Sequence, residues 1–530
     1  MHTALNKTTV VVAGKTLCVQ SGIYRGKFKS TLNGGTVRGL GSVVIDGYLF
    51  TTLASDIDAS QTSIPVADPS AFVMPWQQGG ATSLIVDGEA LYINGINGNT
   101  VSVNRAAAGS STAAVAHTAG TLVRMAGNQL LVNGSNTTYQ DIEIKNSEPL
   151  RNWQTDGAEG LRGNGIFNTG NGNRFINLIA HDNLSGIFTG SSSSNTEVYG
   201  CLSYNNGMDD PAADPPGKGH GMYLENSAGY LKIYDNIVLN NFNNGIQLYG
   251  RSAASVGGDL QGNAVANSGA PLASVPSQRN RNMILGTETQ RMPDIIVKSN
   301  YLFHPQGVNG SNCTFGYGSG IDDGHVTDNY FVGGGGIGLT IEDSTRITVS
   351  NNKFFTTNSS GVNIQSNQAP AGNYTIAGNT YYNTGTTARK YGNTTILDNQ
   401  NFSQWKSATG YDLTGSAAMT NAMPDTVIVR PNAYQQGRAN IIVYAPSGAA
   451  SISIDLSQAG LVNGQAYTIQ NAFNFNGLPV VTGVYNSLIP TITIPFAGAA
   501  SLVATPFGSS YTPPTTAPQF AAFIVIPATS

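Results

Sequence analysis

The sequence predicts an all-β chain: a parallel β-helix, a small inserted antiparallel β unit and a C-terminal β-sandwich domain. Glycine supplies 64 of the 530 residues, and charged residues supply only 11%. Solvated helix faces are normally built from Lys and Glu, so their scarcity argues against a helical protein. The third observation is an internal repeat in the middle of the chain, which decides the predicted fold.

The repeat shows when short segments that contain asparagine are aligned. Two columns follow from this alignment, an apolar one and a polar one. The aligned segments are Asn177–Asn183, Gly200–Asn206 and Asn236–Phe242, with Leu178, Cys201 and Ile237 in the apolar column and Asp182, Asn205 and Asn241 in the polar one. Further copies begin at Asn263, Asn300, Asn329, Asn352 and Asn379. Asparagine tolerates the left-handed backbone of a tight turn, and its amide can bond the asparagine of the next coil.

A second phase of the repeat consists of glycine, an apolar residue, and an aromatic or polar residue. It occurs at Gly165–Phe167, Gly186–Phe188, Gly221–Tyr223 and Gly245–Gln247. Each repeat therefore holds two or three short strands separated by Gly/Asn turns. Successive coils of such a solenoid stack about 4.8 Å apart, so that like residues form ladders along its axis.

Interruptions of the repeat divide the chain into four predicted segments. Residues 1–50 begin the β-helix, 51–125 form the inserted unit, 126–403 continue the β-helix, and 404–530 form the sandwich. In the inserted unit, Asp87-Gly88 and Asn97-Gly98 are hairpin turns between short apolar strands. In the last segment, strands such as Ala439–Tyr444 indicate a sandwich.

Charge and composition exclude several classes of partner. A net charge of −4 provides no basic surface for nucleic acid. No run of about 18 apolar residues is present, so no membrane span is expected. Three scattered cysteines suit neither a disulfide framework nor a zinc site. No signal peptide is visible, which predicts either a secreted protein without its leader or a virion part released by lysis.

The repeats from Asn128 to Tyr382 resemble the right-handed parallel β-helix group of pectate lyases, polygalacturonases, mannuronan epimerases and phage tailspikes. The segment Ser21–Arg25 resembles the start of many secreted members, and the inserted unit is similar to modules of phage tail proteins. The tail, Trp405 to Pro527, resembles sandwich domains of extracellular carbohydrate enzymes. The resemblance implies an extracellular or virion-borne protein, monomeric or homotrimeric, that acts on a polysaccharide laid along the β-helix.

The insertion from Met208 to His220 predicts a catalytic site, because it concentrates three aspartates, a lysine and a histidine. Hydrolysis of a glycosidic bond needs a carboxylic acid and a carboxylate, about 5 to 10 Å apart. Asp209 and Asp210 are the predicted pair, Glu225 and Asp182 are alternative partners, and His220 would orient groups or relay a proton. The predicted substrate contacts are Lys218, Arg162, Tyr223, Tyr204, His181 and Tyr249.

Two alternatives stay open. In β-elimination on a uronate, Lys218 or His220 would be the base and Tyr223 would donate to the leaving oxygen. Calcium would then be held by Asp209, Asp210 and Asp214; hydrolysis would require no cofactor. Epimerase activity is not expected, because the Asp-Pro-His-Asp motif of the epimerases is incomplete here. The other alternative is a non-catalytic glycan-binding or adhesive protein, in which no two carboxyl groups face one groove.

Overall fold

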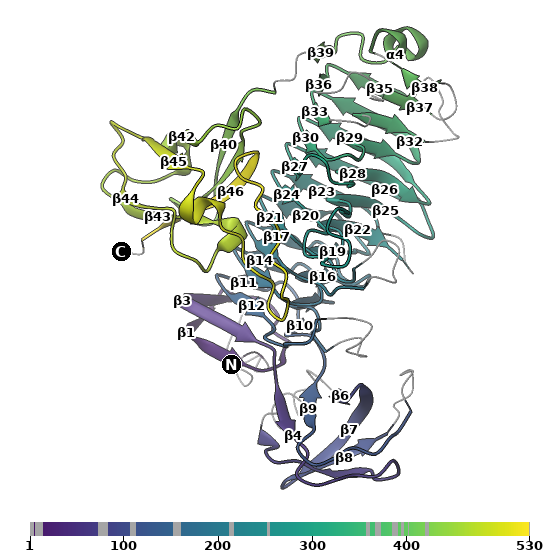
Figure 1. Cartoon of the computed structure of the whole chain (residues 1–530), viewed down its shortest axis with the longest axis vertical. Coiled ribbons are helices and arrows are strands. Elements are labelled where there is room, and N and C mark those ends of the chain that lie inside the picture. The colour runs from purple at the N-terminus through teal and green to yellow at the C-terminus, as the bar shows by residue number, and fades with distance from the viewer. Residues whose placement is uncertain are drawn as a thin grey trace.

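The computed structural model shows a long β-helix with two appended β domains (Figure 1). It describes residues 5, 14–70, 72, 83–105, 113–151, 161–210, 217–251, 255–356, 361–365, 373–383, 391–393, 397–400, 402–418 and 423–528. The C-terminal domain lies along one flank of the β-helix, and the inserted unit lies beyond the end where the helix begins. The all-β fold class that the sequence predicts is confirmed.

Two long sheets form the walls of the β-helix. The larger is 21-stranded in the described part of the chain, and consecutive strands along its ladders are parallel. Its strands are β1 (Thr16–Arg25), β3 (Thr36–Asp46), β11 (Thr138–Gln140), β12 (Glu143–Lys145), β14 (Arg174–Ile176), β15 (Ile179–His181), β17 (Glu197–Tyr199), β18 (Leu202–Tyr204), β20 (Leu231–Tyr234), β21 (Ile237–Leu239), β23 (Gly258–Gln261), β24 (Ala264–Ala266), β26 (Met292–Lys298), β27 (Tyr301–His304), β29 (Ile321–Thr327), β30 (Tyr330–Gly333), β32 (Ser344–Ser350), β33 (Lys353–Thr356), β35 (Tyr374–Ala377), β36 (Thr380–Asn383) and β39 (Ser416–Ala418).

The second sheet is 12-stranded within the same ranges and is parallel up to its last pair. Its strands are β2 (Phe28–Ser30), β10 (Leu130–Val132), β13 (Ile166–Asn168), β16 (Ile187–Thr189), β19 (Met222–Leu224), β22 (Ile246–Gly250), β25 (Met283–Thr287), β28 (Cys313–Gly318), β31 (Leu339–Ile341), β34 (Val362–Ile364), β37 (Tyr391–Asn393) and β38 (Leu397–Gln400). A typical coil thus takes one strand from this sheet and two from the larger sheet. This matches the predicted two or three strands per repeat.

The interior of the β-helix is filled by columns of apolar side chains. The Gly-apolar-aromatic phase of the repeat is in the predicted register, and its middle residue points inward. One such column, with every member buried, is Ile166, Ile187, Met222, Ile246, Met283, Cys313, Leu339 and Val362. Because each member packs on those above and below it, burial of this column stabilises the stack of coils.

A ladder of buried asparagines stabilises the turns between the two strands of the larger sheet. In each coil, the backbone N–H and Nδ2 donate to the side-chain oxygen of the next member, at 2.8 to 3.1 Å. The members are Asn236, Asn263, Asn300, Asn329, Asn352 and Asn379, and Asp412 is the last acceptor. The predicted asparagine ladder is therefore confirmed from residue 236 onward.

The predicted alignment of the third copy is wrong by one residue. Asn177 and Gly200 occupy the left-handed turn position, and the third residue in that position is Asp235, with φ of 53°. Asn236 therefore pairs with Cys201, whose backbone N–H donates to its Oδ1 at 2.9 Å. The polar column shifts in the same way, so that Asn240 replaces Asn241 above Asn205.

The inserted unit is an antiparallel sheet between β3 and the return of the chain at β10. Its strand order is β4-β9-β6-β7-β8-β5. The strands are β4 (Phe50–Thr52), β5 (Ser63–Pro65), β6 (Ser83–Val86), β7 (Glu89–Asn97), β8 (Thr100–Asn104) and β9 (Leu122–Met125). Asp87 and Gly88 both have positive φ, as a tight hairpin turn requires.

The C-terminal domain consists of two antiparallel sheets that share an apolar core, as a β-sandwich does. The five-stranded sheet has β40 (Thr426–Pro431), β41 (Ala439–Tyr444), β46 (Phe520–Pro527), β43 (Ala466–Asn471) and β44 (Val481–Val484); the two-stranded sheet has β42 (Ser451–Asp455) and β45 (Thr491–Pro495). Short 3-10 helices η1 (Leu456–Ala459), η2 (Ala472–Asn474) and η3 (Gly498–Ser501) connect them. The parallel ladder extends past the predicted boundary at residue 403, because β39 pairs with β36 after α4 (Phe402–Thr409).

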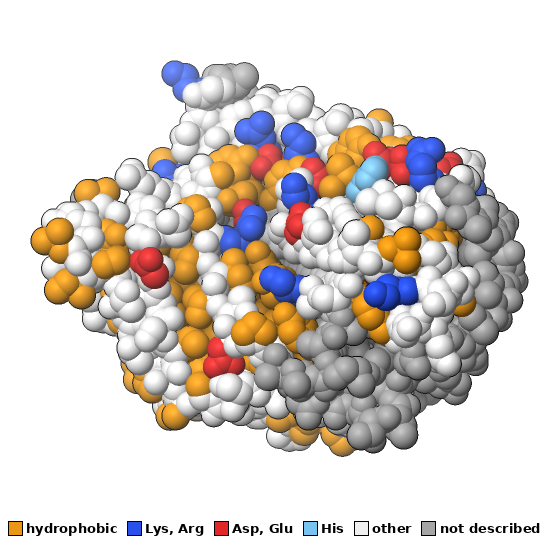
Figure 2. Space-filling model, turned by 90° about the horizontal axis from the view of Figure 1, so that it is seen from above, with side chains coloured by type: hydrophobic (Ala, Val, Ile, Leu, Met, Phe, Trp, Pro, Cys, Tyr) orange, Lys and Arg blue, Asp and Glu red, His pale blue; other side chains and the backbone are white. Residues whose placement is uncertain are grey.

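This domain covers one column of strands on the larger sheet. The strands β18, β21 and β24 are buried throughout, because their outward residues pack on the domain. Phe303 of β27 stacks on Phe520 of the domain, with ring centroids 5.0 Å apart. Seen from the end of the β-helix, hydrophobic side chains lie on the domain and along its junction with the helix (Figure 2). We call this side the covered face.

Candidate functional site

The opposite wall, the 12-stranded sheet, carries an open groove of about 720 Å³. The outward residues of four successive coils form its floor, and residues just before and after the strands form its sides. The lining side chains used below are Phe167, Phe188, Tyr223, Gln247, Tyr249, Ser185, Lys218, His220, Glu225, Arg251 and Glu288. Because stacked coils supply them, residues more than a hundred positions apart meet in one site.

Aromatic rings form the floor of the groove. Phe167, Phe188 and Tyr223 occupy the same outward position on β13, β16 and β19. The Phe188 and Tyr223 rings stack at 4.7 Å, and Phe167 meets Phe188 edge-on at 5.0 Å. Each ring remains partly exposed. Because the faces of Phe188 and Tyr223 cover each other, the strip presents ring edges along the helix axis. It forms an apolar floor against which the C–H groups of sugar rings can pack.

Two glutamates border this floor beside one arginine. The Glu225 residue is only 7% exposed, and its carboxylate has weak donors: the Tyr223 hydroxyl and the Arg251 backbone N–H, both at 3.4 Å. Burial therefore raises the pKa of Glu225 despite those hydrogen bonds. The carboxylate of Glu288 lies 3.8 Å from Nε of Arg251 and is half exposed. The groove thus offers a carboxyl group that retains its proton to higher pH and a second, solvated carboxylate.

His220 lies before β19 in the column predicted for it, between Ser185 and Asn244. Its ring stacks on Tyr223 with centroids 5.4 Å apart, and its Nδ1 has no hydrogen-bond partner among the described residues. Burial and the nearby Lys218 charge lower the pKa of His220 to about 4. The imidazole is therefore neutral at neutral pH. Burial, and then the Glu225 charge, raise the pKa of Tyr223 above its ordinary value.

The predicted acid–base pair, Asp209 and Asp210, does not meet in this groove. Asp209 accepts hydrogen bonds from the backbone N–H and hydroxyl of Ser274, in a separate hollow of about 300 Å³. Asp210 is 3% exposed, and its carboxylate lies 3.8 Å from the Lys218 ammonium. The two carboxylates thus have different partners, Ser274 for Asp209 and Lys218 for Asp210, and neither lines the open groove. Of the predicted catalytic residues, Glu225 and His220 line the groove.

Asp182, His181 and Tyr204 lie together, but on the covered face. Asp182 accepts hydrogen bonds from Nη1 of Arg151 at 2.7 Å and from the Phe507 backbone N–H of the C-terminal domain at 2.8 Å. His181 bonds Asp182, and its ring stacks on Tyr204. All three residues are at most 6% exposed. The C-terminal domain covers these three side chains, so they do not line the open groove. The catalytic role of Asp182 and the substrate contacts of His181 and Tyr204 stay predictions.

Arg162, the predicted glycan contact, lies inside the fold and not in the open groove. Its side chain is fully buried. The guanidinium donates to backbone carbonyls of Leu150, Asn146, Asp182 and Phe507 at 2.7 to 3.3 Å. A buried arginine that donates to this many carbonyls joins neighbouring coils to the C-terminal domain and does not reach the surface.

No group of three or more His, Cys, Asp or Glu side chains that could hold a metal is found among the described residues. Asp209 and Asp210 contact Ser274 and Lys218, respectively, and Asp214 lies outside the described part of the chain. A calcium site at this loop stays a prediction.

Sequence reasoning missed Glu288, Arg251, Phe188 and Gln247. Gln247 and Phe188 had a usable signal, since both stand in the aromatic position of the second repeat phase. Arg251 directly follows Gly250, the last residue of β22, and Glu288 directly follows Thr287, the last residue of β25. Gly250 and Thr287 pair with each other across the two strands. The sequence predicts this pairing only if the long segment between β22 and β25 is first recognised as an insertion and left out of the repeat alignment.

Comparison with known proteins supports the fold. The family model described as a right-handed β-helix region matches residues 83–265. Together with the parallel sheets, this match shows a right-handed parallel β-helix, as predicted. The matched range begins inside the inserted antiparallel unit. A comparison with curated proteins finds no match to the sequence. In the described residues, no helix is long and apolar enough to cross a membrane.

Solved structures similar to this chain include XylC in complex with xylose, at 11% identity and TM-score 0.38, covering 92% of this chain and 91% of that one. Another is the gp54 tailspike of Acinetobacter baumannii bacteriophage AP22 with capsular saccharide, at 11% identity and TM-score 0.23, covering 98% and 89%. A third is the Dettilon tailspike protein, at 12% identity and TM-score 0.29, covering 96% and 86%. At these scores the chains do not superpose as whole molecules, and no residue acquires a role from them.

Proposed function

We propose that the open groove binds a polysaccharide and hydrolyses its glycosidic bonds. One observation carries this proposal: two carboxyl groups with different environments border a single groove with an aromatic floor. Glu225 is buried with a raised pKa, whereas Glu288 is solvated beside Arg251. Two carboxyl groups that differ in this way are the usual requirement for glycoside hydrolysis.

The roles follow from these environments. Glu225 is the general acid that protonates the leaving oxygen, because its pKa is raised by burial. Glu288 is the carboxylate that activates water or stabilises the positive charge that develops on the sugar. Arg251 contacts both glutamates, through its backbone N–H and its Nε. It therefore couples the strands that carry them.

Substrate binding relies on the aromatic floor and the polar sides of the groove. Phe167, Phe188 and Tyr223 pack against the C–H groups of successive sugar rings, and Gln247 and Lys218 contact hydroxyl or acidic groups. The strip runs along the helix axis, since its members come from consecutive coils. An extended chain of sugars is therefore a better match than a single free sugar.

A second candidate reaction is β-elimination on a uronate. His220 favours it, because its neutral ring has an unpartnered Nδ1 in the described structure and stacks on a tyrosine that keeps its proton. His220 would remove the proton beside the sugar carboxylate, Tyr223 would protonate the leaving oxygen, and Arg251 would neutralise the carboxylate. Hydrolysis is preferred because elimination gives no role to the raised pKa of Glu225.

Incubation with a panel of neutral and uronate polysaccharides tests the proposal. Hydrolysis gives new reducing ends without ultraviolet absorbance of an unsaturated uronate; elimination gives both. Glu225→Gln should lower the rate by about 10²- to 10⁴-fold, as loss of a general acid does. Glu342→Gln is the matched control, because burial also raises the pKa of Glu342 but its side chain does not line the groove.

Each outcome is decisive. If a glycan binds but no new reducing ends form, the protein is a non-catalytic glycan-binding protein, which would contradict the proposal. Full activity in Glu225→Gln would show that the acid lies elsewhere. Extended polysaccharide chains occur mainly outside cells. We therefore expect the protein to act extracellularly or on a virion. Its mass in solution distinguishes a monomer from a homotrimer.

A further inference from the structure

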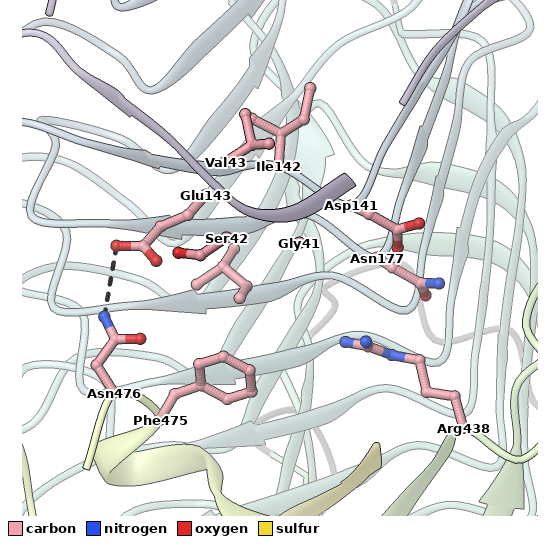
Figure 3. Close-up of a pocket in the computed structure, with 11 residues that line it drawn as sticks. Gly41, Ser42, Val43, Asp141, Ile142, Glu143, Asn177, Arg438, Phe475 and Asn476 are labelled. Carbon is pink, nitrogen blue, oxygen red and sulfur yellow. Dashed lines mark hydrogen bonds between the residues drawn. The ribbon is translucent and has the colours of Figure 1, made fainter. Parts of the chain in front are cut away.

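A second hollow lies between the start of the β-helix and the C-terminal domain (Figure 3), and none of its lining residues belongs to the open groove. It encloses about 240 Å³. Its walls come from β3, from the turns that follow β11 and β14, and from two domain segments next to β41 and η2. We call it the interdomain hollow, and the residues that matter are Asp141, Glu143, Asn177, Arg438, Phe475 and Asn476.

Arg438 is the unusual member of this wall. The residue is 8% exposed, yet its guanidinium makes no hydrogen bond or ion pair with any described residue, and its buried Nε has no partner. Figure 3 shows the guanidinium directed into the space between Asn177 and Phe475. Burying a cation without a partner costs several kcal/mol. An anion in the hollow would remove that cost.

The neighbouring carboxylates do not form an ion pair with Arg438, because each contacts another cation. Asp141 pairs with Nε of Arg38 at 3.2 Å. Glu143 pairs with Nε2 of His181 at 3.0 Å and accepts a hydrogen bond from Asn476 at 3.4 Å. Neither approaches Arg438 within ion-pair distance. The Asp141 charge offsets part of the cost of burying Arg438, but the Arg438 guanidinium has no ion pair or hydrogen bond with a described residue of this hollow.

Other features of the hollow indicate the rest of the ligand. The buried Asn177 Nδ2 makes no hydrogen bond within normal distance and angle limits. It lies close enough to Asp141 to stabilise that carboxylate, and it is a second donor group in the wall of the hollow. Phe475 contributes an aromatic side chain to the opposite wall. The volume is below the range of about 300 to 1,000 Å³ typical for drug-sized ligands, so the occupant is small.

We propose that the interdomain hollow binds a carboxylate-bearing molecule of the size of one sugar ring, with Arg438 paired to the carboxylate. Asn177 donates to a further oxygen, and Phe475 packs against the apolar face of the ring. Such a ligand would join the β-helix to the C-terminal domain, because its contacts come from both. The site is separate from the open groove and does not depend on the reaction proposed there.

Calorimetric titration of the full chain with sodium D-glucuronate tests this, with D-glucose and sodium acetate as comparison ligands. Glucuronate should bind, and both comparison ligands should bind at least about tenfold more weakly, since each lacks one of the two recognised parts. Equal binding of either comparison ligand, or no binding of glucuronate, would overturn the proposal.

Two variants locate the site. Arg438→Gln should weaken glucuronate binding at least about tenfold, because it removes the charge-assisted pair. Asn476→Trp leaves Arg438 in place and fills the exposed rim of the hollow, so it should abolish binding even if Arg438→Gln fails to fold. Arg174→Gln is the control, since Arg174 lies on β14 and is exposed outside the hollow. Unchanged binding in Asn476→Trp would place the ligand elsewhere and contradict the assignment.

Discussion

The two faces of the β-helix carry the same pair of residue types in opposite electrostatic environments. On the covered face, His181 stacks on Tyr204 with centroids 4.7 Å apart; in the open groove, His220 stacks on Tyr223 at 5.4 Å. His181 lies between two carboxylates, Asp182 at 2.7 Å and Glu143 at 3.0 Å. His220 has no carboxylate partner among the described residues and is close to Lys218.

The pKa values of the two histidines diverge accordingly. Burial alone would lower the pKa of His181, but hydrogen bonds to Asp182 and Glu143 outweigh it and raise the pKa to about 9. Burial and Lys218 lower that of His220 to about 4. On the covered face a charged histidine holds coils and domain together, whereas in the groove a neutral ring is available to a ligand. A His–Tyr stack is therefore no indication of function until its surroundings are known.

The largest effect is expected from removing the charge at the centre of the covered face. Asp182→Asn leaves the guanidinium of Arg151 buried with its ion pair broken. Loss of one partner of a buried pair typically costs about 3 to 5 kcal/mol. Denaturant unfolding of the whole chain should show a destabilisation of that size.

The control for this variant is Asp323→Asn, on an exposed pair. The Arg346 side chain that pairs with Asp323 is 64% exposed, so solvent screens the pair and the expected loss is far smaller than for Asp182→Asn. Equal destabilisation in the two variants would contradict the distinction between the covered face and the solvent-exposed surface.

The next effect is a pH dependence of opposite sign at the two histidines. His181 binds its proton more tightly when folded, so its contribution is complete below about pH 6.5 and is lost as pH rises toward 9. At about 1.4 kcal/mol per pH unit, that contribution is about 3 kcal/mol. His220 behaves in the opposite way: stability is lost as pH falls from about 6.5 toward 4, because only the unfolded chain takes up the proton.

Unfolding free energies from pH 5 to 9 for the parent chain, His181→Gln and His220→Gln measure both effects. His181→Gln should remove part of the loss at alkaline pH, and His220→Gln part of the loss at acidic pH. Each variant is the control of the other. A change in the same pH range for both would refute the assigned environments.

The sequence was sufficient for the fold because its signals are periodic. The asparagines from Asn236 to Asn379 and the glycine phase from Gly165 to Gly245 recur in every coil, so each copy supports the others. One-residue shifts are harder to detect: Asp235 and Asn236 are both turn formers, and only the observed left-handed φ of Asp235 assigns the column. That ambiguity explains the misaligned third copy.

The site was predicted only in part, for a different physical reason. The concentration of charged residues after Met208 predicted a functional site at this loop. Of the residues predicted there and next to it, His220 and Glu225 line the groove. Two aspartates of that loop have partners within the fold, Ser274 for Asp209 and Lys218 for Asp210. Whether Asp182 faces solvent depends on where a domain more than 200 residues later packs. Nothing near Asp182 in the sequence carries that information.

The smallest effect distinguishes the two tyrosines. Tyr223→Phe keeps the stacked ring but removes the hydroxyl that donates to Glu225 at 3.4 Å. This hydrogen bond holds the pKa of Glu225 down, so its loss should raise that pKa further and shift the alkaline limb of the pH–activity profile upward by less than about one unit.

The rate of Tyr223→Phe should fall less than about tenfold, as expected for one weak hydrogen bond. Tyr204→Phe is the matched change on the covered face, where the hydroxyl makes no hydrogen bond with a described residue; activity should be unchanged and stability should stay within about 0.5 kcal/mol. If Tyr204→Phe moved the pH–activity profile and Tyr223→Phe did not, the reaction would belong to the covered face. The C-terminal domain would then have to move away for substrate to enter, which the buried contacts of Asp182 with Arg151 and Phe507 oppose.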